Sequence, residues 1–79
     1  MAEIVIVGSL NMDLVVQAHR MPSAGETVRG TAFSTVPGGK GANQAAAVAL
    51  LGGHVAMIGC VGDDAFGERL LRSLGSFGV

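Results

Sequence analysis

With 79 residues, the chain has room for one small domain at most, and a chain of this size buries only roughly 60% of the surface that its unfolded form exposes. Hydrophobic residues make up 49% of the sequence and charged residues 14%, which favours a packed interior over disorder. The formal net charge of −1 makes neither a nucleic acid nor an anionic membrane an obvious partner.

The reactive side chains are few. Cys60 is the only cysteine, which excludes an internal disulfide and a cysteine metal cluster, and its apolar surroundings predict a small core residue. His19 and His54 lack an acidic or cysteine partner at ligand spacing, so we expect no metal site. The chain starts without the basic residues of a signal peptide, and no apolar run approaches the roughly 20 residues of a membrane span, so a cytoplasmic protein is expected.

Residues 4–7 form a continuous β-branched run that ends at Gly8, which predicts a strand buried on both faces of a parallel sheet. In such sheets ligands collect at the carboxyl ends of the strands, and Asn11 and Asp13 follow this one. In extended chain their side chains point to one side, where they can donate and accept hydrogen bonds to vicinal hydroxyls. An Asx turn at the strand end explains the same spacing equally well.

Two further strands are predicted at residues 14–18 and 27–36, with a turn-rich loop between them. The second is rich in Thr and Val and contains Gly30, a residue typical of a bulge. Together they predict an antiparallel hairpin over residues 14–36. Such a hairpin is a flap over a site, an edge that pairs with a second subunit, or an ordinary cover of the core.

The segment of residues 36–44 holds three glycines within four positions and runs directly into the alanine-rich residues 45–51. The glycines let the backbone approach a ligand closely, and the alanines predict a helix. The free N–H groups and the positive end of the helix dipole then face any ligand in front of the turn. Because Lys40 and Asn43 add an ammonium and a carboxamide, we expect a site for a small polar ligand here.

Two well-known phosphate-binding loops do not fit this segment. A Walker A loop has a glycine where Ser34 stands and a Ser or Thr where Gly41 stands. The dinucleotide fingerprint has a glycine at its sixth position, which is Gln44 when the count begins at Gly39.

Residues 52–53 are both glycine and end the helix, and residues 54–61 predict a second buried strand. For Asp63 and Asp64, capping of the next helix is favoured over binding of a metal. That helix has one apolar face, formed by Phe66, Leu70, Leu71 and Leu74.

This order of elements is the opening of a doubly wound, mostly parallel α/β sheet with a right-handed crossover. Two parallel strands and two helices cannot cover both faces of a sheet whose strands are apolar throughout. We therefore expect the chain to be an N-terminal fragment of a larger domain, or one half of an assembly.

Four motifs, spread over nearly the whole chain, resemble in order and spacing the N-terminal part of the PfkB-type, ribokinase-like family of carbohydrate and adenosine kinases. They are Gly-Ser-Leu-Asn-Met-Asp at 8–13, Pro-Ser-Ala-Gly-Glu-Thr at 22–27, Gly-Gly-Lys-Gly-Ala-Asn-Gln-Ala at 38–45 and Ile-Gly-Cys-Val-Gly-Asp-Asp-Ala-Phe-Gly at 58–67. Within the family, the third motif is similar to that of the ribokinases.

The resemblance implies a central, mostly parallel sheet flanked by helices, with an inserted β lid. Residues 1–13 and 37–79 would belong to the α/β core, and residues 14–36 would be the lid, which pairs with the lid of a second subunit in a homodimer. It also implies transfer of the γ-phosphoryl group of ATP to a primary hydroxyl, such as the 5-hydroxyl of D-ribose, with Mg²⁺ and a monovalent cation, K⁺.

Matched position by position, the sugar-binding residues of the family correspond to Asn11, Asp13, Gly39, Lys40, Gly41 and Asn43. The family's catalytic aspartate, nucleotide pocket and cation site belong to its C-terminal part. The resemblance therefore assigns no catalytic, cofactor-binding or metal residue to this chain, and the isolated 79 residues are expected to be inactive.

Other functions stay open on the sequence alone. The chain is compatible with a sibling kinase for fructose, a modified sugar or a nucleoside. It is also compatible with a non-catalytic module that binds a sugar or dimerises, and with a truncated product that does not fold stably.

Overall fold

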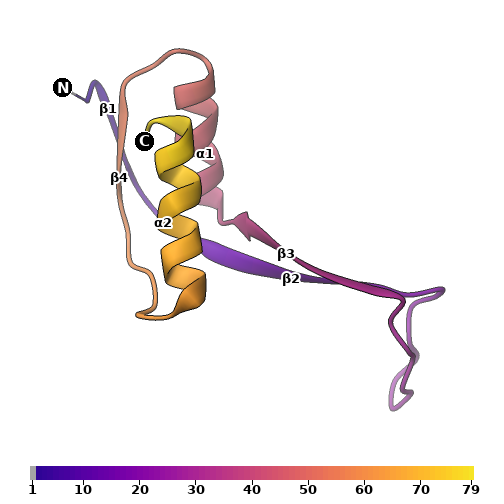
Figure 1. The fold of residues 1–79 in the computed structure, drawn as a ribbon. Helices are drawn as coiled ribbons and strands as arrows, with labels where there is room; N and C mark the ends of the chain where they lie inside the picture. Colours follow the sequence, from indigo (N-terminus) through magenta and orange to yellow (C-terminus); the bar gives the residue numbers. More distant parts are fainter. Residues whose placement is uncertain (1) are drawn as a thin grey trace.

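The computed structural model describes residues 2–79, which form a compact body and a projecting hairpin (Figure 1). The body contains the parallel strands β1 (Ile4–Val7) and β4 (Val55–Ile58), together with the helices α1 (Lys40–Leu50) and α2 (Ala65–Phe77). The hairpin is the antiparallel pair of β2 (Asn11–Gln17) and β3 (Ala32–Gly38). Because the hairpin extends away from the body, the principal axes measure 51 × 27 × 20 Å.

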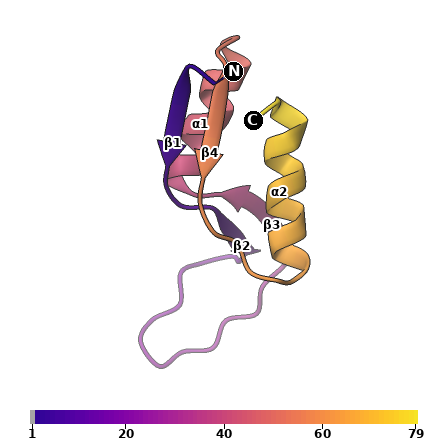
Figure 2. The ribbon, with the colours of Figure 1, turned by 90° about the vertical axis from the view of Figure 1, so that its left-hand side faces the viewer.

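The parallel sheet is covered on one face only. β1 and β4 pair from Ile4↔Val55 to Val7↔Ile58, and both helices lie on the same side of the pair (Figures 1 and 2). Val55, on the helical side, is 8% exposed, whereas Val5, Val7 and Ile58 on the opposite face are 56%, 78% and 59% exposed. This bare face agrees with the expectation that two helices leave part of an apolar sheet uncovered.

Helix α1 begins at the predicted glycine turn. Gly39 is its N-cap residue with a φ of 104°, and no side chain caps the first turn. The helix ends at Leu50, and Gly52 follows with a φ of 86°, which confirms the predicted glycine stop. Ala42 and Ala45 are buried because α1 packs against β1, β4 and α2 through these small side chains.

Helix α2 is capped by Asp64, whose Oδ1 accepts a hydrogen bond from the backbone N–H of Gly67 at 2.8 Å. Leu70 is buried, but Phe66 and Leu71, predicted for the same apolar face, are 41% and 59% exposed. The covered stripe is narrow because α2 packs against α1, β2 and β3. Across residues 2–79, neither helix has the length and hydropathy required to cross a membrane.

Several boundaries differ from the sequence predictions. β2 already begins at Asn11, and β3 runs from Ala32 to Gly38, so that residues 27–31 precede the second strand of the hairpin. β4 is shorter than predicted and ends at Ile58. The prediction that Cys60 is a core residue was wrong: its side chain is exposed, because the chain has left the sheet by this point.

Candidate functional site

Asn11 and Asp13 lie at the start of β2, on the same face of the hairpin. Asn11 pairs with Gly38 and Asp13 with Val36, and both polar residues are exposed. Both residues lie in a paired strand. Of the two conformations considered for this segment, extended chain is therefore correct and an Asx turn is not. The carboxylate of Asp13 lies over Gly38, where a Cβ atom would be 2.7 Å from Asp13 Oδ2. Glycine at position 38 therefore makes the space that this carboxylate occupies.

The glycine turn brings the start of α1 into backbone contact with residues 8–11. A Cβ atom on Gly39 would lie 2.5 Å from the Ser9 carbonyl oxygen and 3.0 Å from the Asn11 nitrogen. The N–H of Ala42 donates to that same Ser9 oxygen at 3.1 Å. One of the amides expected to be free for a ligand is thus already bonded within the chain. The glycines at positions 39 and 41 serve close backbone packing as well as access.

Lys40 and Asn43 complete the predicted set from the first turn of α1. They are three residues apart, so their side chains lie on neighbouring positions of the helix surface, and both are exposed. Because Asn11 pairs with Gly38, the start of β2 lies directly beside the turn that leads into α1. The segments that carry one carboxylate, two carboxamides and one ammonium therefore meet at this junction. Such a group can both donate to and accept from hydroxyls.

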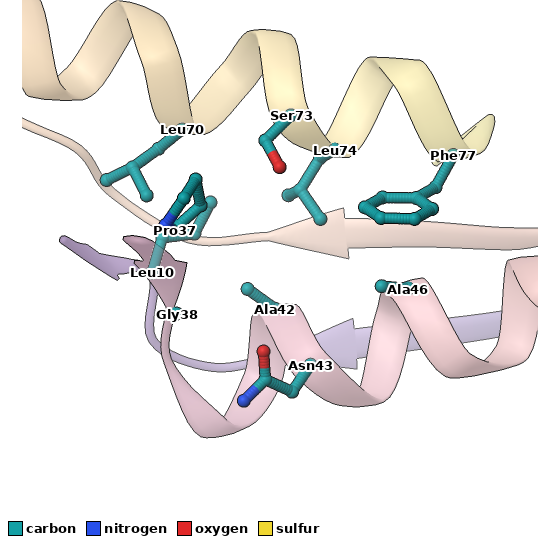
Figure 3. Close-up of a pocket in the computed structure, with 10 residues that line it drawn as sticks. All are labelled: Leu10, Pro37, Gly38, Ala42, Asn43, Ala46, Leu70, Ser73, Leu74 and Phe77. Carbon is teal, nitrogen blue, oxygen red and sulfur yellow. The ribbon is translucent and has the colours of Figure 1, made fainter. Parts of the chain in front are cut away.

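A cavity of about 270 Å³ lies nearby, between α1 and α2 (Figure 3). Its lining is mostly apolar, and Asn43 is the one predicted site residue that it includes. In Figure 3 the Asn43 carboxamide stands apart from Leu70, Leu74 and Phe77 on α2. Apart from Asn43, the polar residues of the junction do not line this apolar cavity. The lining residues are Leu10, Pro37, Gly38, Ala42, Asn43, Ala46, Leu70, Ser73, Leu74 and Phe77.

Within residues 2–79, no three His, Cys, Asp or Glu side chains come close enough together to hold a metal ion. Asp63 and Asp64 were the candidates for a metal site, and the carboxylate of Asp64 caps α2 instead. Residues 2–79 therefore offer no cluster of this kind for a Mg²⁺ ion.

A charged pair with shifted pKa values lies in the loop between β2 and β3. Arg20 donates two hydrogen bonds to the carboxylate of Glu26, at 2.5 and 2.8 Å, and the Ser23 N–H donates to the same carboxylate at 3.0 Å. The guanidinium lowers the pKa of Glu26, and the carboxylate in turn raises the pKa of Arg20. The pair links two residues within the loop of the hairpin and takes no part in the polar junction.

One contact was not foreseen from the sequence. Arg69 on α2 donates from Nη1 to the Thr35 hydroxyl on β3 at 2.7 Å, and the bond is partly buried. The two residues are 34 positions apart, so no local pattern connects them.

A family model described as pfkB family carbohydrate kinase matches residues 1–79. The chain is 57% identical over 79 residues to a ribokinase of Bacillus subtilis (strain 168), an alignment that covers 100% of this chain and 27% of that protein. It is 44% identical over 77 residues to a deoxyribokinase of Salmonella typhi, covering 98% of this chain and 25% of that protein.

Among solved structures, Arabidopsis thaliana ribokinase complexed with ribose and ATP is similar, with a TM-score of 0.80 and 43% sequence identity. The similarity covers 95% of this chain and 24% of the Arabidopsis chain. The chain thus spans about a quarter of the length of the relatives that it matches.

Proposed function

The chain belongs to the pfkB family of carbohydrate kinases, and on this premise we propose that it is the sugar-binding part of an ATP-dependent ribokinase that phosphorylates D-ribose at its 5-hydroxyl. The family and the ribokinase-like fold, both predicted from the four motifs, are confirmed. Because the chain spans about a quarter of its relatives, the proposed activity belongs to the complete protein that contains these residues.

The observation that carries the proposal is the polar junction between β2 and α1. Asn11 and Asp13 share one face of β2 beside the turn that leads to Lys40 and Asn43. Ribose offers several hydroxyls, each of which donates and accepts, and the charged groups of the junction can form charge-assisted bonds with them. We propose as sugar-binding residues Asn11, Asp13, Gly39, Lys40, Gly41 and Asn43.

We assign ATP, Mg²⁺ and K⁺ to parts of the complete protein outside these residues. Phosphoryl transfer depends on positioning and on stabilising the charge of the transferred group. Within residues 2–79, no group of His, Cys, Asp or Glu side chains is suited to a metal ion. The 79-residue segment alone is therefore expected to bind without catalysing transfer.

We further propose that residues 14–36 act as a lid and pair with the lid of a second copy in a homodimer. Leu14, Val16 and Phe33 lie on one face of the hairpin and are 59%, 60% and 64% exposed. An exposed apolar face on a projecting hairpin supports association with another surface.

A second candidate acceptor is 2-deoxyribose, which is favoured by the 44% identity to a deoxyribokinase. The two sugars differ by one hydroxyl. A site whose polar groups bond that hydroxyl discriminates strongly against the sugar that lacks it, because those groups are then left unpaired.

An acceptor panel tests the proposal. The complete protein is incubated with ATP, Mg²⁺ and K⁺ and with D-ribose, 2-deoxy-D-ribose, D-fructose or adenosine, and the products are identified by ³¹P NMR. We expect the highest kcat/KM for ribose and a phosphate on its 5-oxygen. Preference for fructose or adenosine would reassign the substrate. Saturable ribose binding without ATP consumption would instead favour a non-catalytic binding module.

A further inference from the structure

In the part of the chain that the structure describes, one side-chain hydrogen bond joins the hairpin to the body. It is the bond from Arg69 Nη1 on α2 to Thr35 Oγ1 on β3, at 2.7 Å. Both residues are partly buried. The donor is a guanidinium, so the bond is charge-assisted and stronger than one between neutral groups.

This bond holds the opposite face of the strands from the one that carries Asp13. Thr35 and Val36 are neighbours in β3 and therefore point to opposite faces of the hairpin. Val36 pairs with Asp13, so the Asp13 side chain shares the Val36 face, whereas Thr35 faces α2. α2 is also the helix that packs against β2 and β3. Arg69 thus contacts the hairpin on the face opposite to the one that carries Asp13.

Two short segments of the chain connect the hairpin to the body. β2 is reached through residues 8–10, and β3 leaves through Gly38 into Gly39, whose φ of 104° is a conformation that side-chain-bearing residues rarely adopt. Leu10 and Pro37 add a small apolar contact with α2 around the cavity (Figure 3). A projecting hairpin on two such connections can pivot unless a further contact fixes its angle.

We propose that Arg69 is a positioning residue: by bonding Thr35 it sets the angle of the β2–β3 hairpin to the body, and thereby the placement of Asn11 and Asp13 relative to Lys40 and Asn43. The expected effect on sugar affinity rests on the proposed function. The contact itself stands on the structure alone. When the bond is lost, the six proposed sugar-binding residues are all still present, but they are no longer held in one arrangement.

The test uses the complete protein with the variants Arg69→Met and Thr35→Val, each of which removes the bond and keeps most of the side-chain volume. We expect each to raise the sugar KM about 5- to 10-fold, which is less than the full strength of a charge-assisted bond because Arg69 does not itself bind the sugar, while kcat and the KM for ATP stay within about twofold. The double variant should be no worse than either single variant, because all three lose the same interaction. Thr35→Ser keeps the hydroxyl and should behave as the parent protein.

Arg72→Met is the matched control, because Arg72 lies one turn further along α2, is exposed, and forms no side-chain hydrogen bond within residues 2–79. Its sugar KM should be unchanged. The proposal is overturned if Arg69→Met and Thr35→Val leave the sugar KM unchanged, if Arg72→Met raises it equally, or if the two single effects add in the double variant.

Amide hydrogen exchange separates this inference from the proposed function, since it needs no turnover. The amides of residues 33–36 should exchange several-fold faster in Arg69→Met than in Arg72→Met. Equal exchange in the two variants refutes the positioning role, even when ribose is phosphorylated. If no sugar is phosphorylated, the proposed function fails, and the exchange result still decides whether Arg69 holds the hairpin.

Discussion

The backbone of Gly41, in the first turn of α1, lies directly against the backbone of Gly8, at the end of β1. A Cβ atom on Gly41 would stand 2.8 Å from the Cα of Gly8 and 2.9 Å from the nitrogen of Ser9. Both obstacles are main-chain atoms, which cannot rotate away as a side chain can. This contact sets how closely the helix start approaches the segment that leads into Asn11 and Asp13.

Replacing Gly41 by alanine should therefore destabilise the protein, although alanine is the better helix former. The helix preference gains about 1 kcal/mol, whereas overpacking costs about 1–3 kcal/mol. Thermal unfolding measures the net loss. The matched control is Gly75→Ala in α2, because nothing lies within 4 Å of the added methyl group, and a gain of up to about 1 kcal/mol is expected. Equal stability of the two variants would contradict this account of Gly41.

Replacing Asp13 by asparagine should weaken sugar binding selectively. Hydrogen bonds to a charged group contribute about 1.5–3 kcal/mol, so the sugar KM should rise by about 10-fold or more while the KM for ATP changes little. Steady-state kinetics of the complete protein measure both constants. Asn43→Ala should shift the same constant in the same direction, and Asp63→Asn is the control. An unchanged sugar KM in both site variants would remove these residues from the sugar site.

Asp64→Ala should destabilise α2, because the carboxylate accepts the Gly67 N–H at 2.8 Å. Loss of such a cap costs about 1 kcal/mol. Denaturant unfolding measures the change, and Asp64→Ser should restore most of the stability. Asp63→Ala is the control, since α2 is capped by its neighbour. A larger loss of stability in Asp63→Ala than in Asp64→Ala would mean that Asp63, and not Asp64, caps α2.

The Arg20–Glu26 pair gives a prediction for pH. The guanidinium lowers the pKa of Glu26, so the pair stabilises the loop fully above the pKa of an unfolded glutamate, about 4.3, and this contribution is lost as the pH falls through the lower folded value. Carboxyl ¹³C titration of Glu26 measures the midpoint. Arg20→Met should raise it toward the ordinary value. A midpoint that does not move on removal of the guanidinium would mean that the pair does not persist in solution.

Patterns confined to a few neighbouring residues predicted much of the fold. The β-branched run of β1, the glycine turn before Lys40 and the acidic cap at Asp64 were all placed correctly. Each depends on backbone propensities or on bonds within one turn, which the local sequence fixes.

The predictions that failed depend on residues distant in the sequence. Pro37 was assigned to the glycine turn, but it belongs to the strand β3. Its pairing with Met12 extends the hairpin beyond its apolar run. Cys60 was expected in the core from its apolar neighbours, but burial is decided by the elements that pack around a residue. The Arg69–Thr35 bond joins two elements whose approach follows from the whole fold. For the same reason the sequence offered candidates for the site but not the contact between α2 and β3 beside them.

The partner of β1 also determines when this strand can form during synthesis. Ile4 pairs with Val55, so about fifty residues must leave the ribosome before the first strand finds its neighbour, whereas the hairpin closes within its own sequence. At translation rates of about 5–20 residues per second, the apolar segment Ile4–Val7 waits for roughly 3 to 10 s. Ile4–Val7 thus meets its partner strand only after the hairpin has emerged, and for that interval it presents an unpaired apolar segment to chaperones and to neighbouring nascent chains.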